Sequence, residues 1–377
     1  MGELEEMHER PADDESALDH RAREGGVHGT EQGEIPSLHG LRGVAILMVI
    51  VSHSSETIHL GHTGRSLFDL VPTGAFGVNV FFVLSGFLIT RVVLGYSTKK
   101  DRSLKTFYKR RALRLIPALY TFVFIVMILG AVGVFSIPAL AALSALLFIW
   151  DYSPWTVGVW WLGHTWSLSI EEQFYILWAP LLALAGRRRA LKVAVALIVL
   201  VPIARVFVYF AFPTPYLRLR GDSMLHTRAD VLMVGCLIGL LWDSERFQRF
   251  LQRILLRWLL VAAVAYTFVS SFLINHEHGK WSQTVGNSAD AFAIAFIMVY
   301  AVVYSSGWLG RALNSRWMVQ VGLMSYSLYL YQELFLTPLN KSITGAFPLN
   351  IVCTFAAGVA SYYLIEIPFL NLRRRIV

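Results

Sequence analysis

The chain has 377 residues, of which 55% are hydrophobic and 15% are charged, and its mean hydropathy is +0.54. Several apolar runs approach the roughly 20 residues that a helix needs to cross a bilayer, and the alternating strands of a membrane barrel are absent. Composition therefore excludes a soluble domain and predicts an all-α, polytopic integral membrane protein. The two cysteines show neither a disulfide framework nor a metal-binding spacing. We expect no metal, and nothing in the sequence indicates nucleic-acid binding.

Residues 1–34 differ in charge from the rest of the chain. They carry 11 acidic and 3 basic residues, a net charge of −8, so the overall charge of +8 leaves +16 for the remainder. Few large apolar residues occur in this segment, which predicts a disordered acidic tail; a docked regulatory segment is the alternative. The excess of Lys and Arg elsewhere belongs in cytoplasmic loops. This pattern predicts a multi-pass membrane protein with its basic loops in the cytoplasm and with membrane lipids as partners.

The first apolar run, 41–56, contains two ionisable residues, with Arg42 at its start and His53 deep inside it. The separation of eleven positions places both side chains on one helix face, about 16 Å apart along the axis. An ionisable group within a span is costly and therefore indicates a functional site. The alternative is a core histidine bonded to a neighbouring helix.

The basic stretch 99–114 follows a second span over 72–94 and is expected in the cytoplasm. The segment 138–150 is too short for a comfortable crossing, so we interpret it as a re-entrant or interfacial helix. The charge pattern then predicts ten transmembrane helices, both termini in the cytoplasm and a basic tail at 371–377. Its weak point is the connection 213–227, where basic residues lie in a predicted outside loop. The later spans are expected at 115–134, 167–186, 191–212, 228–242, 256–274, 289–306, 318–338 and 348–366.

Six sequence blocks lie between residues 35 and 370. They are Arg-x10-His at 42–53, FFVLSGFLIT at 81–90, FYKRRALRLIPALY at 107–120, TWSLSIEEQFYILWAP at 165–180, VGLMSYSLYLYQ at 321–332 and IEIP at 365–368. Together they resemble, in order, the motifs of the membrane-bound acyltransferase-3 family, the O-acetylases that modify bacterial envelope sugars and some antibiotics. Gln332 departs from the pattern, because many members of the family have histidine there.

The resemblance implies a transmembrane acyltransferase domain over 35–370 in a multi-pass protein of the bacterial inner membrane. Such an enzyme transfers an acyl group, with acetyl as the expected one, from cytoplasmic acyl-CoA to a hydroxyl of a sugar, glycan or related acceptor. His53, Glu171 and Arg42 match motif positions and are the predicted catalytic residues. Arg111 and Arg114 match the Arg-x-x-Arg-x-x-Pro element and, with Arg42, are expected to bind acyl-CoA.

Depth along each span groups four polar residues independently of the resemblance. His53, Asn79, Glu171 and Gln332 lie about 7–10 Å below the outer ends of their predicted spans. A shared polar cavity explains this match; hydrogen bonds that only join helices are the alternative. Within the cavity, His53 is the expected base, Glu171 orients its ring or binds the acceptor, and Asn79 and Gln332 bind the acceptor.

Other polar residues lie at the two ends of the spans. Arg228 and Asp230 open a span on the outer side, where we expect acceptor binding, with interfacial anchoring as the alternative. Arg111 and Arg114 share one face of a cytoplasmic helix end. Planar guanidinium groups bind phosphate oxygens in a bidentate manner, and coenzyme A carries phosphates. Anionic lipid headgroups are the alternative ligand.

These observations predict an O-acyltransferase with His53 as the base. A neutral histidine can remove the hydroxyl proton of the acceptor, and an acyl-histidine intermediate is an open variant. The alternative function is a membrane transporter of a polar solute that uses the same cavity. The identity of the acceptor and the oligomeric state are not predicted by the sequence.

Overall fold

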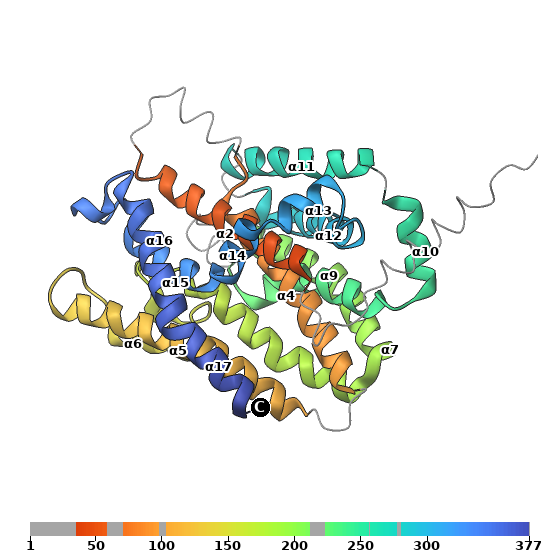
Figure 1. Ribbon diagram of the computed structural model, residues 1–377, viewed down its shortest axis with the longest axis horizontal. Helices are drawn as coiled ribbons and strands as arrows, with labels where there is room; N and C mark the ends of the chain where they lie inside the picture. Colours follow the sequence, from red (N-terminus) through yellow and green to blue (C-terminus); the bar gives the residue numbers. More distant parts are fainter. Residues whose placement is uncertain are drawn as a thin grey trace, which may run out of the picture. The chain divides into compact units, whose positions relative to one another are not determined.

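The computed structural model describes residues 35–58, 71–97, 103–211, 223–255, 257–276 and 280–376 (Figure 1). Every regular element among them is helical. The predicted tail 1–34 and the basic positions Arg218 and Arg220 lie outside the described residues. From Ser37 onward the chain forms one compact unit.

The long helices are α2 (Pro36–Ser55), α4 (Gly74–Ser97), α5 (Leu104–Ala131), α7 (Thr165–Ala211), α9 (Leu225–Leu241), α11 (Arg257–His276) and α12 (Asn287–Val303). Shorter helices are α6 (Ala139–Leu146), α10 (Glu245–Ile254), α13 (Trp308–Leu313), α14 (Arg316–Leu323), α15 (Ser325–Phe335), α16 (Leu349–Ser361) and α17 (Ile367–Ile376). Single helical turns are η1 (Pro154–Thr156), η2 (Ser282–Gly286), η3 (Ile343–Gly345) and η4 (Tyr362–Glu366). The predicted tail from 371 forms the last turns of α17.

Within the described residues, seven helices are long and apolar enough to cross a membrane, or eight if the bent pair α9 and α10 is one span. The protein is thus a helical, polytopic membrane protein. The difference from ten has a local origin. Helix α7 has 47 residues and joins two predicted spans across Gly186, where φ is +74°. The predicted span 318–338 is divided at Met324 into α14 and α15, which have 8 and 11 residues. The number of spans and the side of each terminus remain predictions.

Helix α2 is fixed against α14 by direct backbone contact. A Cβ atom on Gly43 would lie 2.5 Å from the carbonyl oxygen of Met318, and one on Gly322 would lie 1.8 Å from that of His39. Larger residues at these positions would force the helices apart, so glycine permits the close approach. This contact fixes the N-terminal half of α2 against α14, and α15 directly follows α14.

The segment between α6 and α7 folds back into the protein. Helix α6 has eight residues, about 12 Å in length and far short of a bilayer core. After it, Leu162, His164 and Thr165 are 0%, 2% and 1% exposed. Helix α7 therefore begins inside the protein. The sequence interpretation had assumed that it begins at an outer surface.

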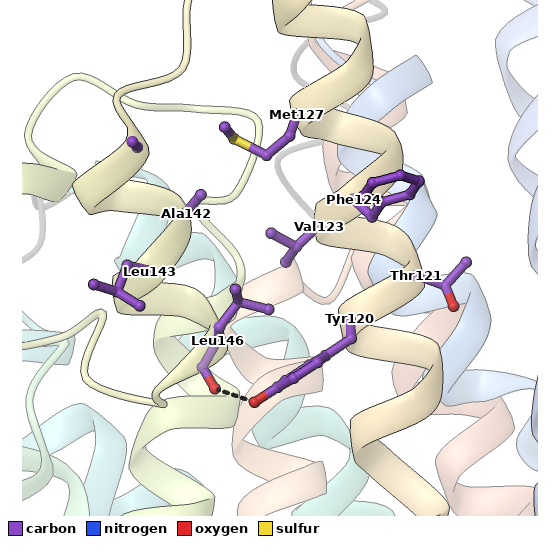
Figure 2. Close-up of a pocket in the computed structure, with 9 residues that line it drawn as sticks. Tyr120, Thr121, Val123, Phe124, Met127, Ala142, Leu143 and Leu146 are labelled. Atoms are coloured by element: carbon purple, nitrogen blue, oxygen red, sulfur yellow. Dashed lines mark hydrogen bonds between the residues drawn. The ribbon is translucent and has the colours of Figure 1, made fainter.

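An apolar groove lies between α5 and α6, which run side by side (Figure 1). Figure 2 shows Val123 and Met127 of α5 directed toward Ala142 of α6, and Tyr120 of α5 beside Leu146 of α6. The groove has a volume of about 670 Å³. The Tyr120 hydroxyl donates a hydrogen bond of 3.4 Å to the carbonyl oxygen of Leu146. Its lining contains no ionisable acid, histidine or arginine, so the groove is not the candidate reaction site.

Candidate active site

His53 lies in the last turn of α2, opposite α15. Its Nδ1 atom is 2.6 Å from Oε1 of Gln332, and its ring packs edge-on against Trp160 with the ring centroids 6.3 Å apart. Because the amide oxygen of Gln332 only accepts hydrogen bonds, Nδ1 donates to it, and in the neutral ring Nε2 carries the lone pair. The predicted neighbours His53 and Gln332 are therefore in contact, and the histidine nitrogen that faces away from Gln332 is the basic one.

A second histidine binds the next residue of α15. His164, just before α7, has its Nδ1 atom 2.8 Å from Oε2 of Glu333, and its backbone N–H donates to the same oxygen at 3.2 Å. The histidine side chain is 2% exposed and that of Glu333 is 7% exposed. The Tyr329 hydroxyl donates to the carbonyl oxygen of His164. The sequence analysis assigned no role to His164 or Glu333. Their positions beside the 165–180 block and beside Gln332 were the available signals.

A separate polar cavity of about 90 Å³ lies where α2, α4, α5, α7 and α15 meet. Arg42, Arg111, Arg114 and Glu171 all line it. Arg42 and Arg114 have no hydrogen-bond or ion-pair partner within the described part of the chain. Two arginines that share a cavity without such a partner form a site for an anion with several oxygens.

Arg111, by contrast, is already occupied by protein groups. Its Nε donates to Glu172 at 2.7 Å, its terminal nitrogen also pairs with Glu172, and Glu171 is 3.9 Å away. The guanidinium group stacks on the ring of Tyr175, 3.6 Å from its centroid. Ser85 donates to Glu171 at 2.9 Å. One guanidinium thus reaches both glutamates, although they point in different directions from α7.

The structure corrects the predicted depth of Glu171. We expected this residue in the same layer as His53, but it lines the arginine cavity beside Arg111. The reason is the buried start of α7 at Thr165, since the prediction counted depth from an assumed outer end. Glu366, expected near the arginines, is 3% exposed and accepts a hydrogen bond of 2.6 Å from Ser327.

The remaining predicted acceptor residues belong to a third polar group, which we name the paired cluster. Its members, on α4, α7, α9 and α12, are Asn79, Arg205, Arg228, Asp230, Asn287, Ser288 and Asp290. Arg228 donates to Asn79 at 3.0 Å and to Asn287 at 2.5 Å. Arg205 and Asp230, both 1% exposed, form a bidentate ion pair at 3.1 Å. The structure thus places Asn79 against Arg228 and pairs Asp230 with Arg205 in this cluster, whereas His53 pairs with Gln332 on α15.

The fold and these sites define a helical, multi-pass membrane protein. Helix α2 contributes Arg42 to the arginine cavity and His53 to a second site, which we name the histidine site and which also contains Trp160, His164, Gln332 and Glu333. The family model described as an acyltransferase domain matches residues 35–367. The chain therefore belongs to the acyltransferase-3 family, as the sequence blocks predicted.

Three relatives illustrate the similarity. The chain is 28% identical over 367 residues to the putative peptidoglycan O-acetyltransferase YrhL of Bacillus subtilis (strain 168), a match covering 89% of this chain and 54% of the relative. It is 26% identical to the peptidoglycan O-acetyltransferase OatA of Listeria monocytogenes, with 89% and 55% covered. It is also 26% identical to the O-acetyltransferase OatA of Staphylococcus aureus (strain NCTC 8325), with 89% and 57% covered. The chain spans about half the length of these relatives, and no solved structure matches it.

Proposed function

We propose that this protein transfers an acetyl group from cytoplasmic acetyl-CoA, or another acyl-CoA, to a glycan hydroxyl at the outer side of the inner membrane. The observation that carries the proposal is that one helix, α2, contributes a residue to each of two sites. Arg42, near one end of α2, lines the arginine cavity, and His53, near the other end, is held by Gln332. The sites lie about 16 Å apart along the helix, which is a distance that a long, flexible donor can bridge.

The arginine cavity is the proposed site for the donor. Arg42 and Arg114 bind the phosphate groups of acyl-CoA, since both guanidinium groups lack a protein partner among the described residues. Arg111 acts indirectly: its bonds to Glu172 and its contact with Glu171 hold the wall of the cavity in place. A volume of about 90 Å³ is far smaller than acyl-CoA, so the surrounding helices separate when the donor enters.

His53 is the proposed base of the transfer reaction. Its Nε2 atom removes the proton from the acceptor hydroxyl, and the hydroxyl oxygen bonds to the acyl carbon. The carbon–sulfur bond then breaks, and the proton passes from His53 to the departing thiolate. Gln332 keeps the base in the correct tautomer throughout. In the covalent variant, Nε2 attacks the acyl carbon before the hydroxyl does.

The acceptor is proposed from the names of the relatives, which are peptidoglycan O-acetyltransferases. Peptidoglycan is a glycan with free hydroxyls, as the sequence analysis expected of the acceptor. Asn79, Arg228 and Asp230 are proposed to join α4, α9, α7 and α12, because their polar atoms are already bonded within the paired cluster. The family model and the relatives lend no support to the transporter alternative.

The test uses the purified full chain in lipid vesicles with radiolabelled acetyl-CoA. We expect release of free CoA, detected with a thiol reagent, and movement of the label to an added peptidoglycan fragment. His53→Asn is the matched control, because asparagine retains a donor toward Gln332 and loses the basic nitrogen. Well-folded wild-type protein that releases no CoA with the fragment present would overturn the proposal.

A further inference from the structure

Three buried side-chain nitrogens, two on residues that contact His53 and one on a residue bonded to Glu333, have no hydrogen-bond partner among the described residues. They are Nε1 of Trp160, Nε2 of Gln332 and Nε2 of His164, and we name them the open nitrogens. Gln332 is 0% exposed and His164 is 2% exposed. Buried polar groups are hydrogen-bonded in the great majority of cases, and each exception calls for a reason. Three exceptions on residues joined through His53 and the neighbouring Gln332 and Glu333 point to a common ligand.

The contacts that the three residues make place them relative to His53. Gln332 uses its amide oxygen on His53 Nδ1, so its amide nitrogen lies beside the same ring. Trp160 contacts the His53 ring with its own ring. His164 is held through Glu333, which neighbours Gln332 in α15. Trp160 and Gln332 thus border the His53 ring, and His164 is joined to the same stretch of α15.

The chemistry of these nitrogens matches hydroxyl oxygens. The Trp160 and Gln332 nitrogens are donors. Because Nδ1 of His164 bonds the Glu333 carboxylate, its Nε2 is the acceptor in the neutral ring. A hydroxyl group both donates and accepts, so one acceptor molecule with several hydroxyls satisfies donors and acceptor together. An apolar or singly hydroxylated molecule leaves some of them unbonded.

Access to this site is from the end of α2. His53 and Trp160 are partly exposed, and Glu56, one turn beyond His53, is exposed. Charge patterning places this end of α2 on the outer side. A polar acceptor can therefore reach His53 without passing the arginine cavity.

We propose that Trp160, His164 and Gln332 form a binding site for the additional hydroxyl groups of a polyhydroxylated acceptor, while His53 acts on the reacting hydroxyl. Glu333 is a positioning residue that aims His164. The inference rests on the proposed function and names the recognition chemistry of its acceptor. It predicts discrimination between a sugar and an alcohol of similar size that has one hydroxyl.

The test compares methyl glucoside with cyclohexanol, two six-membered rings, as acceptors for acetyl-CoA with the full chain in vesicles. Trp160→Phe keeps the aromatic ring and removes its N–H. His164→Asn keeps a donor toward Glu333 and removes Nε2. Each change should lower kcat/KM for the glucoside about three- to tenfold, the effect of one hydrogen bond. The value for cyclohexanol should change by less than about twofold on the same scale. The control Trp317→Phe, at a side chain 85% exposed, should change neither.

The outcomes separate this inference from the proposed function. Equal losses with both acceptors would mean that the residues only support the fold or His53, and the inference would be wrong. The same conclusion follows if wild-type protein releases CoA from acetyl-CoA but does not prefer the glucoside, and then the proposed function stands. Wild-type protein that consumes no acetyl-CoA with any acceptor contradicts the proposed function itself. If His164→Asn does not fold, Trp160→Phe, at a partly exposed position, decides the matter.

Discussion

The paired cluster and the histidine site are both buried, polar and built from several helices, but they differ in how completely their groups are bonded. In the paired cluster, Arg205 bonds Asp230, Ser288 and two carbonyl oxygens. Asp290 accepts hydrogen bonds from Tyr266, Ser270 and Asn79. In the histidine site, the three open nitrogens have no hydrogen-bond partner in the part of the chain that the structure describes. Complete pairing is typical of a group that joins helices, whereas incomplete pairing indicates a place for a ligand.

The same contrast occurs inside the arginine cavity. Arg111 is hydrogen-bonded to Glu172 and stacked on the ring of Tyr175. Arg42 and Arg114 line the cavity without a hydrogen-bond or ion-pair partner among the described residues. The two arginines of the Arg-x-x-Arg element are therefore not equivalent. One is expected to hold the cavity together, and the other to bind its ligand. Mutations can test both comparisons.

The largest expected effect is that of His53→Asn on acyl transfer. Removal of a general base lowers kcat by about 10²–10⁴. Asparagine still offers an N–H toward Gln332, so the thermal unfolding midpoint in detergent should change little. The rate of CoA release with the acceptor present is the measurement. Near-wild-type turnover by a folded variant would remove His53 from the mechanism.

Asp230→Ala should act in the opposite sense, on stability and not on chemistry. It leaves Arg205 buried without its carboxylate, and such a loss costs about 3–5 kcal/mol of unfolding free energy. The unfolding midpoint should fall, while activity per folded molecule stays unchanged. The double variant Arg205→Met with Asp230→Leu should recover much of the loss, because no unpaired charge remains. A selective defect in acceptor kinetics would instead return Asp230 to the acceptor site.

Arg114→Ala should raise KM for acyl-CoA about ten- to a hundredfold, since a lost bond to a charged group costs about 1.5–3 kcal/mol. Lysine at this position should restore only part of the affinity, because it lacks the planar fork.

Arg111→Ala, unlike Arg114→Ala, should lower the unfolding midpoint, since Glu172 loses its partner. Lys109→Ala, at an exposed side chain on the same helix, is the control. A lower midpoint in Arg114→Ala with unchanged acyl-CoA affinity would contradict the distinction.

The sequence predicted the parts of this architecture that depend on local pattern. The helical class, the family and the placement of Arg42 and His53 on one helix follow from composition, motif and helical periodicity. The depth of Glu171 could not be predicted, because it depends on the segment before α7 folding inward and burying Leu162 and Thr165. Span counting assumes that helices begin at the membrane surface, and this helix does not.

Pairing between distant residues was the other part that pattern could not supply. Asn79 and Arg228 are 149 positions apart, and either could equally have faced a cavity. His164 was missed because it lies in a connection that periodicity does not describe, and its carboxylate partner Glu333 is 169 positions away. A polar residue in a span can be recognised as unusual from sequence, but its partner becomes known only from the fold.

The smallest expected effect concerns Asp151, whose Oδ2 atom is the fourth buried polar atom without a partner among the described residues. Asp151 lies between α6 and η1, outside the spans, where Gln173 donates to its other oxygen at 2.7 Å. Burial raises the pKa of this carboxyl from 3.8 to about 6. Between these values the folded protein binds more protons than the unfolded chain, so stability falls as pH rises and then levels off above about pH 6.

Asp151→Asn should remove this dependence, because the amide keeps the shape and stays neutral. Two pKa units correspond to about 3 kcal/mol, and solvent near the loop reduces this to about 1–3 kcal/mol in the variant's favour at pH 7. Below about pH 4 the two proteins should be equally stable, since the wild-type carboxyl is then protonated in both states. Unfolding midpoints in detergent at pH 4, 5, 6 and 7 provide the measurement. A constant difference across this range would mean that Asp151 titrates normally, and that its unpaired buried oxygen, unlike the open nitrogens, has no chemical consequence.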